Sequence, residues 1–196
     1  MEYPTKEEAV DILEWAGKKN PGKWVEHSKN VALAAKIICE KLGDADPEKA
    51  YVLGLLHDIG RYVGLSGVRH ILEGYRLCMR NGWEKAARIC MTHSYMIQDI
   101  KSEIAQWDVT EEEKVFIRDY ISECKYDFYD RLIQLCDSLA TDRGFCLLET
   151  RFIDVARRYG VGEYTVPRWE AVIAIKEEIE SKIGCSIYDL LPVYLS

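Results

Sequence analysis

Histidines and acidic residues are the side chains of this chain that could do chemistry, and the pair His57-Asp58 is the most informative. The pair follows two leucines in the segment 54–61, which reads Gly-Leu-Leu-His-Asp-Ile-Gly-Arg. An imidazole and a carboxylate directly behind an apolar run are costly to bury unless they have a partner. A metal ion is one such partner, and a salt bridge to Arg61 is the structural alternative.

The chain has four histidines, and the other three are His27, His70 and His93. His27 lies 30 residues before the pair, and Asp137 lies 79 residues after Asp58. Taken singly, a histidine on a helix is more often a hydrogen-bonded, half-buried side chain than a ligand. Imidazole nitrogen and carboxylate oxygen suit iron, manganese, zinc, nickel or cobalt, and no thiolate is required.

The motif Leu-Leu-His-Asp-Ile-Gly, with His27 upstream and Asp137 downstream, resembles the HD superfamily of metal-dependent phosphohydrolases over about residues 20–145. Members with two metals carry two more histidines in the interval where His70 and His93 fall. This six-ligand order is similar to that of the YqeK-like proteins, which hydrolyse symmetrical diadenosine tetraphosphate. The interval from Asp58 to His70 is 12 residues, shorter than in those relatives, so we expect a rebuilt loop there.

The resemblance implies a dinuclear metal centre with about two divalent transition metals per chain, as in two-metal hydrolases. The first metal would take His27, His57, Asp58 and Asp137, and the second would take His70 and His93, with Asp58 as the bridge. A hydroxide held between the ions would attack phosphorus in line. The implied function is hydrolysis of a phosphate ester or anhydride of a nucleotide or similar small molecule, with Asp58 central to catalysis.

Three arginines near these positions are candidates to bind the substrate phosphate: Arg61, Arg69 and Arg143. A guanidinium group can hold a phosphate through two parallel hydrogen bonds, and a surface ion pair is the alternative for each arginine. Arg61 is also a candidate catalytic residue. Glu73, one helical turn after His70, is another, because it could orient a ligand or assist proton transfer. A plain surface glutamate is the alternative there.

Helices are predicted to position these residues. The capping-box spacings Thr5/Glu8 and Thr110/Glu113 predict two helix starts, and Asp46-Pro47 predicts a third. The helix from Pro47 is expected to end near Gly60, and other helical patterns cover about 22–42, 69–79, 83–91, 129–139, 145–159 and 167–183. No stretch alternates apolar and polar residues, so the predicted fold is an all-α, single-domain helical bundle of the HD type over 1–196. Its core would be about 20–145, with a helical extension at 146–196.

The composition excludes several classes of protein. With 26 Lys and Arg against 33 Asp and Glu, the net charge of −7 argues against a nucleic-acid partner. No apolar run approaches the ~18 residues of a membrane span, and the N-terminus carries no apolar signal region. Seven cysteines without a Cys-x-x-Cys pair predict free thiols in a reducing cytoplasm. The expected partner is a small phosphorylated substrate such as a nucleotide, and the oligomeric state is left open.

Other functions stay open at this point. HD-fold di-iron oxygenases use the same ligand order, and they would be distinguished by iron and oxygen consumption. A non-catalytic sensor that retains the metal site is a third hypothesis. A helical protein with no metal is the last, and it predicts that His27, His57, Asp58 and Asp137 lie far apart.

Overall fold

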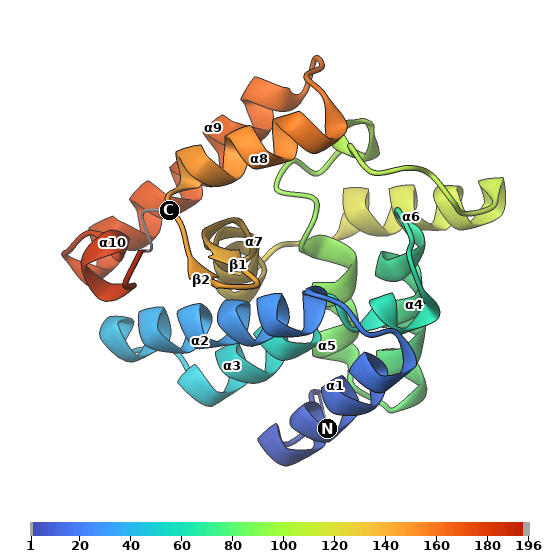
Figure 1. Cartoon of the computed structure of the whole chain (residues 1–196), viewed down its shortest axis with the longest axis horizontal. Helices are drawn as coiled ribbons and strands as arrows, with labels where there is room; N and C mark the ends of the chain where they lie inside the picture. Colours follow the sequence, from blue (N-terminus) through green and yellow to red (C-terminus); the bar gives the residue numbers. More distant parts are fainter. Residues whose placement is uncertain (1, 194–196) are drawn as a thin grey trace.

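The computed structural model describes residues 2–193, which form a bundle of helices (Figure 1). Ten α-helices, two 3₁₀ helices and one two-stranded sheet make up the regular structure of these residues, so the predicted all-α fold class is confirmed. The elements are α1 (Lys6–Lys19), α2 (Trp24–Leu42), α3 (Pro47–Leu56), η1 (Ile59–Val63), α4 (Arg69–Arg80), α5 (Glu84–Thr92), η2 (Ile100–Ser102), α6 (Glu111–Glu123), α7 (Phe128–Leu139), β1 (Ala140–Thr141), β2 (Gly144–Phe145), α8 (Leu148–Tyr159), α9 (Thr165–Ile183) and α10 (Ile187–Leu190).

The predicted helix starts are confirmed by their capping hydrogen bonds. Thr5 and Glu8 form a reciprocal capping box at α1, and Thr110 and Glu113 form another at α6. The Asp46 side chain accepts hydrogen bonds from the first backbone amides of α3. These side chains satisfy amide groups that have no partner inside the helix, which sets where each helix begins.

The predicted end of α3 near Gly60 is wrong. The α-helix ends at Leu56, and the chain continues through the His57-Asp58 pair into η1. A side chain at Gly60 would collide with the backbone of His70 and Gly74, so glycine allows η1 to lie directly against α4. The break in the helix therefore turns Asp58 toward the helix that carries His70.

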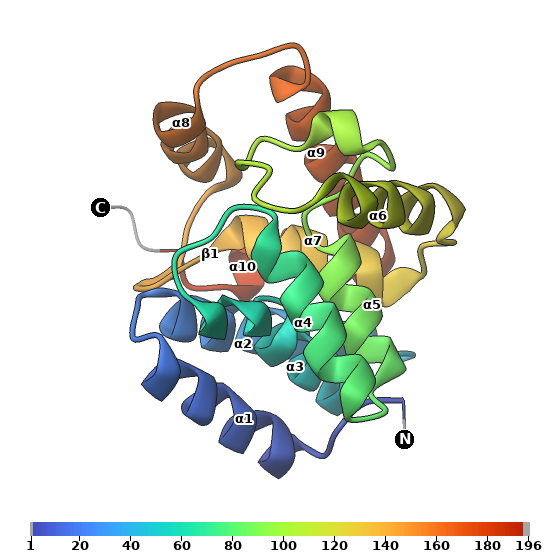
Figure 2. The same ribbon diagram turned by 90° about the vertical axis from the view of Figure 1, so that its right-hand side faces the viewer.

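Helix α7 lies in the middle of the molecule. Figure 1 views it nearly end-on, with α2 and α3 on one side and α8 and α9 on the other. α7 packs against α2, α3, α5, α8 and α9, and α4 packs against α5 and η1. In the turned view of Figure 2, α1 lies at the opposite end of the molecule from α8 and α9. Helices that are far apart in sequence thus meet around one helix, and their apolar faces form the main core.

The C-terminal part differs from the prediction at one point. The helix expected from Phe145 begins at Leu148, because Phe145 pairs with Ala140 in the hairpin β1–β2. Gly144 is the first residue of β2 after the hairpin turn, and its φ of 127° favours glycine. Helices α8 and α9 are joined by stacked rings of Phe152 and Trp169, with centroids 5.3 Å apart.

Two further expectations concern the chain as a whole. All seven cysteines are free, and five of them are buried, as their apolar neighbours predicted. Over residues 2–193, the helices are all too short or too polar to cross a membrane.

Candidate metal centre

A first group of ligand-type side chains forms where α2 meets α7. His27 Nε2 lies 2.9 Å from Asp137 Oδ1, although the two residues are 110 apart in sequence. His57, at the end of α3, places Nε2 3.9 Å from the same carboxylate oxygen. The ring centroids of His27 and His57 are 5.3 Å apart. The hypothesis of a helical protein with no metal predicted that these residues lie far apart. That prediction is therefore wrong.

Asp58 lies between this group and a second one. Its Oδ2 is 3.8 Å from His57 Nε2, while its Oδ1 is 3.2 Å from His70 Nε2 and 3.6 Å from His93 Nε2. His70 belongs to α4, and His93 follows the last residue of α5. One carboxylate therefore faces both groups, which is the arrangement that a bridging ligand requires.

Three of the imidazole rings are oriented by backbone carbonyls. In each ring Nδ1 lies within hydrogen-bonding distance of a carbonyl oxygen three residues earlier. The pairs are His57 with Gly54 at 2.7 Å, His93 with Cys90 at 2.9 Å, and His70 with Gly67. When Nδ1 donates in this way, the lone pair of the ring lies on Nε2. All three Nε2 atoms then point at Asp58.

Several atoms at the centre are buried without a hydrogen-bond partner in the described part of the chain. They are His57 Nε2, Asp58 Oδ1 and His70 Nε2. Buried polar atoms of this kind cost about 1–3 kcal/mol each unless something satisfies them. The donor atoms of His27, His57 and Asp58 lie within 4.8 Å of one another, as do those of Asp58, His70 and His93. Two cations would satisfy these atoms, so the residues present fit a dinuclear centre of nitrogen and oxygen ligands.

The pKa values favour the protonation states that a metal needs. Burial lowers the pKa of His57, and it lowers the pKa of His93 to about 4. Burial alone would raise the pKa of Asp58, but Arg61 and the neighbouring imidazoles hold it well below its ordinary value. Neutral imidazoles and an ionised carboxylate at neutral pH can bind a cation without first losing protons.

Arg61 forms the ion pair that the sequence offered as the alternative to a metal. Its Nε donates to Asp58 Oδ2 at 2.6 Å, while Oδ1 still faces His70. Asp58 is therefore oriented by an arginine on one side and open to a cation on the other. Arg143 is exposed in the hairpin turn, where its amide donates to Thr141 Oγ1 at 3.1 Å. Roles in substrate binding for Arg61 and Arg143, and in catalysis for Arg61, stay predictions.

Arg69 and Glu73 are both engaged where α4 faces α6. Arg69 donates to the Asp108 carbonyl at 3.1 and 2.9 Å and to Glu113 at 3.1 Å. Glu73 accepts from Arg76 at 2.8 Å. Their polar groups are used in contacts within the protein, and their predicted roles with substrate or proton stay predictions.

Gln134 is a buried residue of α7 that the sequence reasoning missed. Its Nε2 donates to the Thr92 carbonyl at 2.9 Å and to the Tyr95 carbonyl at 3.2 Å, on either side of His93. Gln134 lies one helical turn before Asp137, so α7 provides one ligand candidate and also holds the segment that carries another. An amide inside the apolar run Leu-Ile-Gln-Leu-Cys was the signal that could have revealed it.

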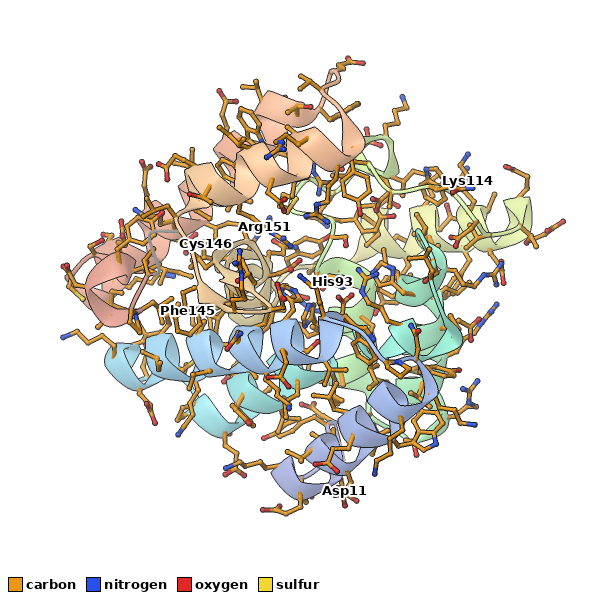
Figure 3. All side chains as sticks on the ribbon, viewed as in Figure 1. Asp11, His93, Lys114, Phe145, Cys146 and Arg151 are labelled. Atoms are coloured by element: carbon orange, nitrogen blue, oxygen red, sulfur yellow. The ribbon has the colours of Figure 1, made fainter. Side chains whose placement is uncertain are left out.

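Arg151 of α8 was also missed. Its Nη2 lies 3.8 Å from Asp137 Oδ1, and Figure 3 shows it on the side of α8 that faces the middle of the molecule, where His93 lies. Burial would raise the pKa of Asp137, but His27, His57 and Arg151 together lower it far below its ordinary value. Nothing in the local sequence around Arg151 indicates this contact, because it depends on how α8 packs on α7.

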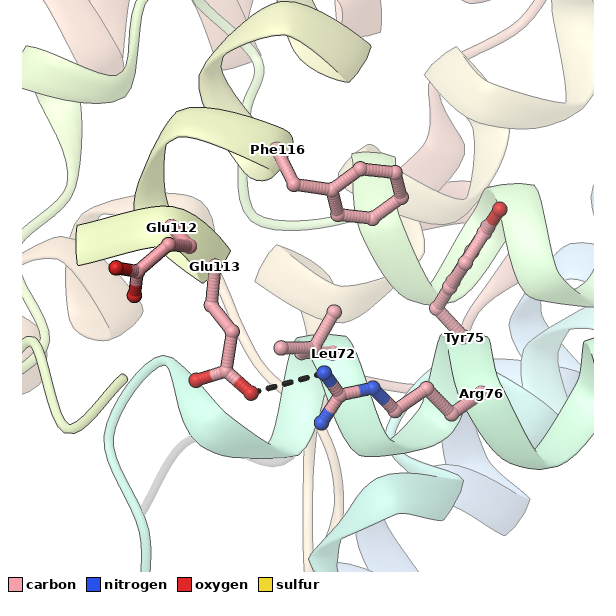
Figure 4. Close-up of a pocket in the computed structure, with 6 residues that line it drawn as sticks. All are labelled: Leu72, Tyr75, Arg76, Glu112, Glu113 and Phe116. Atoms are coloured by element: carbon pink, nitrogen blue, oxygen red, sulfur yellow. Dashed lines mark hydrogen bonds and ion pairs between the residues drawn. The ribbon is translucent and has the colours of Figure 1, made fainter. Parts of the chain in front are cut away.

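A separate hollow of about 320 Å³ lies between α4 and α6 (Figure 4). Its walls are mainly apolar, with Leu72, Tyr75 and Phe116 around the ion pair of Arg76 and Glu113. None of the six metal-ligand candidates lines it. The hollow is therefore separate from the His and Asp groups.

Two groups of His and Asp side chains that lie between helices and share one aspartate are typical of a metal-binding domain. The HD domain family matches residues 24–142, more than half of the chain, and the chain belongs to this family. The resemblance drawn from the sequence is thereby confirmed.

The chain is also similar to part of a curated protein, ribonuclease Y of Helicobacter acinonychis (strain Sheeba). The two are 43% identical over 58 residues, which is 29% of this chain and 11% of ribonuclease Y. The chain thus matches only about a tenth of that protein's length. The search of solved structures found no match.

Proposed function

We propose that this protein is a metal-dependent phosphohydrolase that acts on a phosphate ester or anhydride of a nucleotide or similar small molecule. The observation that carries the proposal is the convergence of His57, Asp58 and His70, whose buried donor atoms face one another without hydrogen-bond partners. Membership of the HD domain family supports hydrolysis as the reaction class.

The proposed ligand sets follow the two groups. The first cation would be held by His27, His57, Asp58 and Asp137, and the second by Asp58, His70 and His93. Imidazole and carboxylate donors suit iron, manganese, zinc, nickel or cobalt. We propose about two ions per chain, because each group has its own donors around the shared Asp58.

When bound, such cations lower the pKa of a water ligand and polarise a phosphoryl oxygen. The water oxygen bonds to phosphorus, the bond from phosphorus to the leaving oxygen breaks, and the leaving oxygen takes up a proton. Arg61 holds Asp58 in place through the 2.6 Å hydrogen bond, so we assign it a positioning role in addition to its predicted contact with substrate. No protein nucleophile is needed in this scheme.

Two observations bear on the substrate. The name of ribonuclease Y makes RNA a candidate, so a short RNA belongs in any substrate panel. The net charge of −7 opposes binding to a polyanion, and it favours a small phosphorylated molecule. We also propose a reducing, cytoplasmic setting, which the seven free cysteines support.

The test combines metal analysis with turnover. Full-length protein should contain close to two metal ions by elemental analysis and should hydrolyse one or more compounds of a panel of nucleotides, dinucleoside polyphosphates and short RNA without oxygen. Asp58→Asn and Asp58→Ala should lose the metal and at least about 1000-fold in activity. Each variant removes the proposed bridging ligand, which costs several kcal/mol of transition-state stabilisation.

Asp142→Asn is the matched control. Asp142 lies in the β1–β2 turn and forms an ion pair with Lys23, so the variant should retain both metal and activity. Full metal content in the Asp58 variants would contradict the bridge. Oxygen consumption without hydrolysis would replace the proposal with the oxygenase alternative.

A further inference from the structure

Three arginines lie around the candidate metal centre, and they come from three different elements. Arg61 belongs to η1, Arg151 to α8 and Arg168 to α9. Burial alone would lower the pKa of Arg61, but Asp58 and, less strongly, Asp137 raise it. Burial lowers the pKa of Arg168, which Glu103 and then Asp137 oppose, while Arg151 Nη2 lies 3.8 Å from Asp137 Oδ1. Four carboxylates accompany these three cationic groups, because Asp154 pairs with Arg151 at 3.6 Å and Glu103 also acts on Arg168.

Two of these arginines are held by hydrogen bonds. Arg61 donates through Nε to Asp58. Arg168 donates through Nη1 to the Ser94 carbonyl at 3.2 Å and to the Ser102 carbonyl at 2.8 Å, which fixes the segment after His93. These two guanidinium groups therefore stabilise the folded protein through hydrogen bonds.

Arg151 differs from both. Its contacts with Asp137 and Asp154 are ion pairs at 3.8 and 3.6 Å, longer than a hydrogen bond, and residues 2–193 offer its side chain no closer polar partner. The side chain is 22% exposed, so it is oriented by charge while its N–H groups stay available. A guanidinium with free donors beside a metal-ligand carboxylate is suited to bind an anion.

We propose that Arg151 binds the phosphoryl group of the substrate and that the site selects a phosphate dianion, as in a monoester or a terminal phosphate, over a diester. The positive charge of Arg151 beside the proposed cations attracts a phosphate with two negative charges more strongly than one with a single charge. The two N–H groups of a guanidinium match two terminal phosphoryl oxygens. A diester also has two such oxygens, so the preference arises from charge, because a monoester carries up to two negative charges and a diester carries one.

This inference rests on the proposed function and deepens it. Arg151 lies outside residues 24–142, the part that matches the HD domain family. Helix α8 therefore supplies substrate preference to a metal centre that residues 27–137 provide.

The experiment uses two substrates with the same leaving group. Metal-loaded full-length protein is assayed with p-nitrophenyl phosphate, a monoester, and with bis(p-nitrophenyl) phosphate, a diester. Arg151→Gln should lower kcat/KM for the monoester about 10- to 100-fold, which corresponds to a charged hydrogen bond, and should change the diester less than about threefold. Arg151→Lys should fall between the two, because a point charge remains without the fork.

Arg158→Gln is the matched control on the same helix. Arg158 is 46% exposed, and its contacts within residues 2–193 are an ion pair with Asp154 at 2.8 Å and the ring of Tyr159, so its removal should leave both activities unchanged. Equal losses on monoester and diester, or no loss on either, would overturn the role of Arg151.

Binding of inorganic phosphate, measured by calorimetry on the same proteins, gives a readout that does not depend on turnover. Arg151→Gln should weaken this binding about tenfold or more, and unchanged affinity would overturn the inference. If the wild-type protein hydrolyses no compound with any metal, the proposed function fails, while the phosphate measurement still decides the role of Arg151.

Discussion

The two ligand groups of the metal centre are built in different ways. The first joins His27 of α2 to Asp137 of α7, and these side chains remain 12% and 23% exposed. The second joins His70 and His93, on neighbouring helices, and their side chains are only 6% and 2% exposed. Asp58 lies between the two groups. The His57 side chain of the first group is itself 0% exposed, so His27 and Asp137 form the open side of the centre, and the second group is buried throughout.

The two ligand groups are held by different contacts. Nε2 of His27 is already engaged with Asp137, so the first group depends on long-range packing of α2 against α7. In the second group, both rings are held by carbonyls of their own helix or of the loop before it. The second group thus depends mainly on carbonyls close to each ring, with support from Gln134 of α7, while the first depends on the packing of α7 against α2.

The largest expected effect comes from breaking the two groups separately. His27→Gln should empty the first group and His93→Gln the second, so each variant should retain about one metal ion per chain. Both should lose at least about 1000-fold in activity, because two-metal chemistry needs both ions. Elemental analysis and turnover measure the two effects.

The double variant His27→Gln/His93→Gln is the control and should bind no metal. Loss of both ions in either single variant would show that the groups are not separable. The comparison between an open and a buried group would then have no functional meaning.

A smaller effect is expected from Gln134→Leu. The change removes the hydrogen bonds to the Thr92 and Tyr95 carbonyls, and it replaces the amide side chain with an apolar one of similar size. Since such supporting contacts affect metal affinity about 10- to 100-fold, the second group should bind its ion more weakly by that factor. The first group should keep its affinity, although Asp137 is on the same helix. Metal titration with a competing chelator resolves the two sites.

Ser138→Ala is the matched control on α7, because within the described residues the Ser138 Oγ donates to the Gln134 carbonyl alone, at 3.1 Å. It should leave both affinities unchanged. Equal weakening of both sites in Gln134→Leu would mean that the variant disturbs α7 as a whole, and the specific support of His93 would be refuted.

The sequence predicted the elements and ligand candidates better than it predicted the contacts around them. Capping residues such as Thr5 and Thr110 act within one helical turn, so local reasoning located those helix starts. The break after Leu56 was missed, because it depends on Gly60 meeting the backbone of α4. The start of α8 was missed, because Phe145 is used in a hairpin.

The candidate site shows the same division. The His and Asp ligand candidates could be found because residue type and order carry the signal. Arg151 could not be found, since its proximity to Asp137 arises only when α8 packs on α7. Arg69 was predicted from its place beside His70, yet packing directs its side chain to Glu113 and Asp108.

The smallest expected effect concerns pH and the buried group in metal-free protein. The pKa of His93 is lowered by burial from 6.5 to about 4, so between these values the unfolded chain binds a proton that the folded chain does not. Stability must therefore fall as the pH is lowered through this window, by at most about 1.4 kcal/mol per pH unit for one such group. Urea unfolding of chelator-treated protein measures the slope. His93→Gln should flatten it, leaving the part due to His57, whose pKa burial also lowers. A slope of zero or of opposite sign in the wild-type protein would mean that the second group is hydrated, and the contrast with the open first group would disappear.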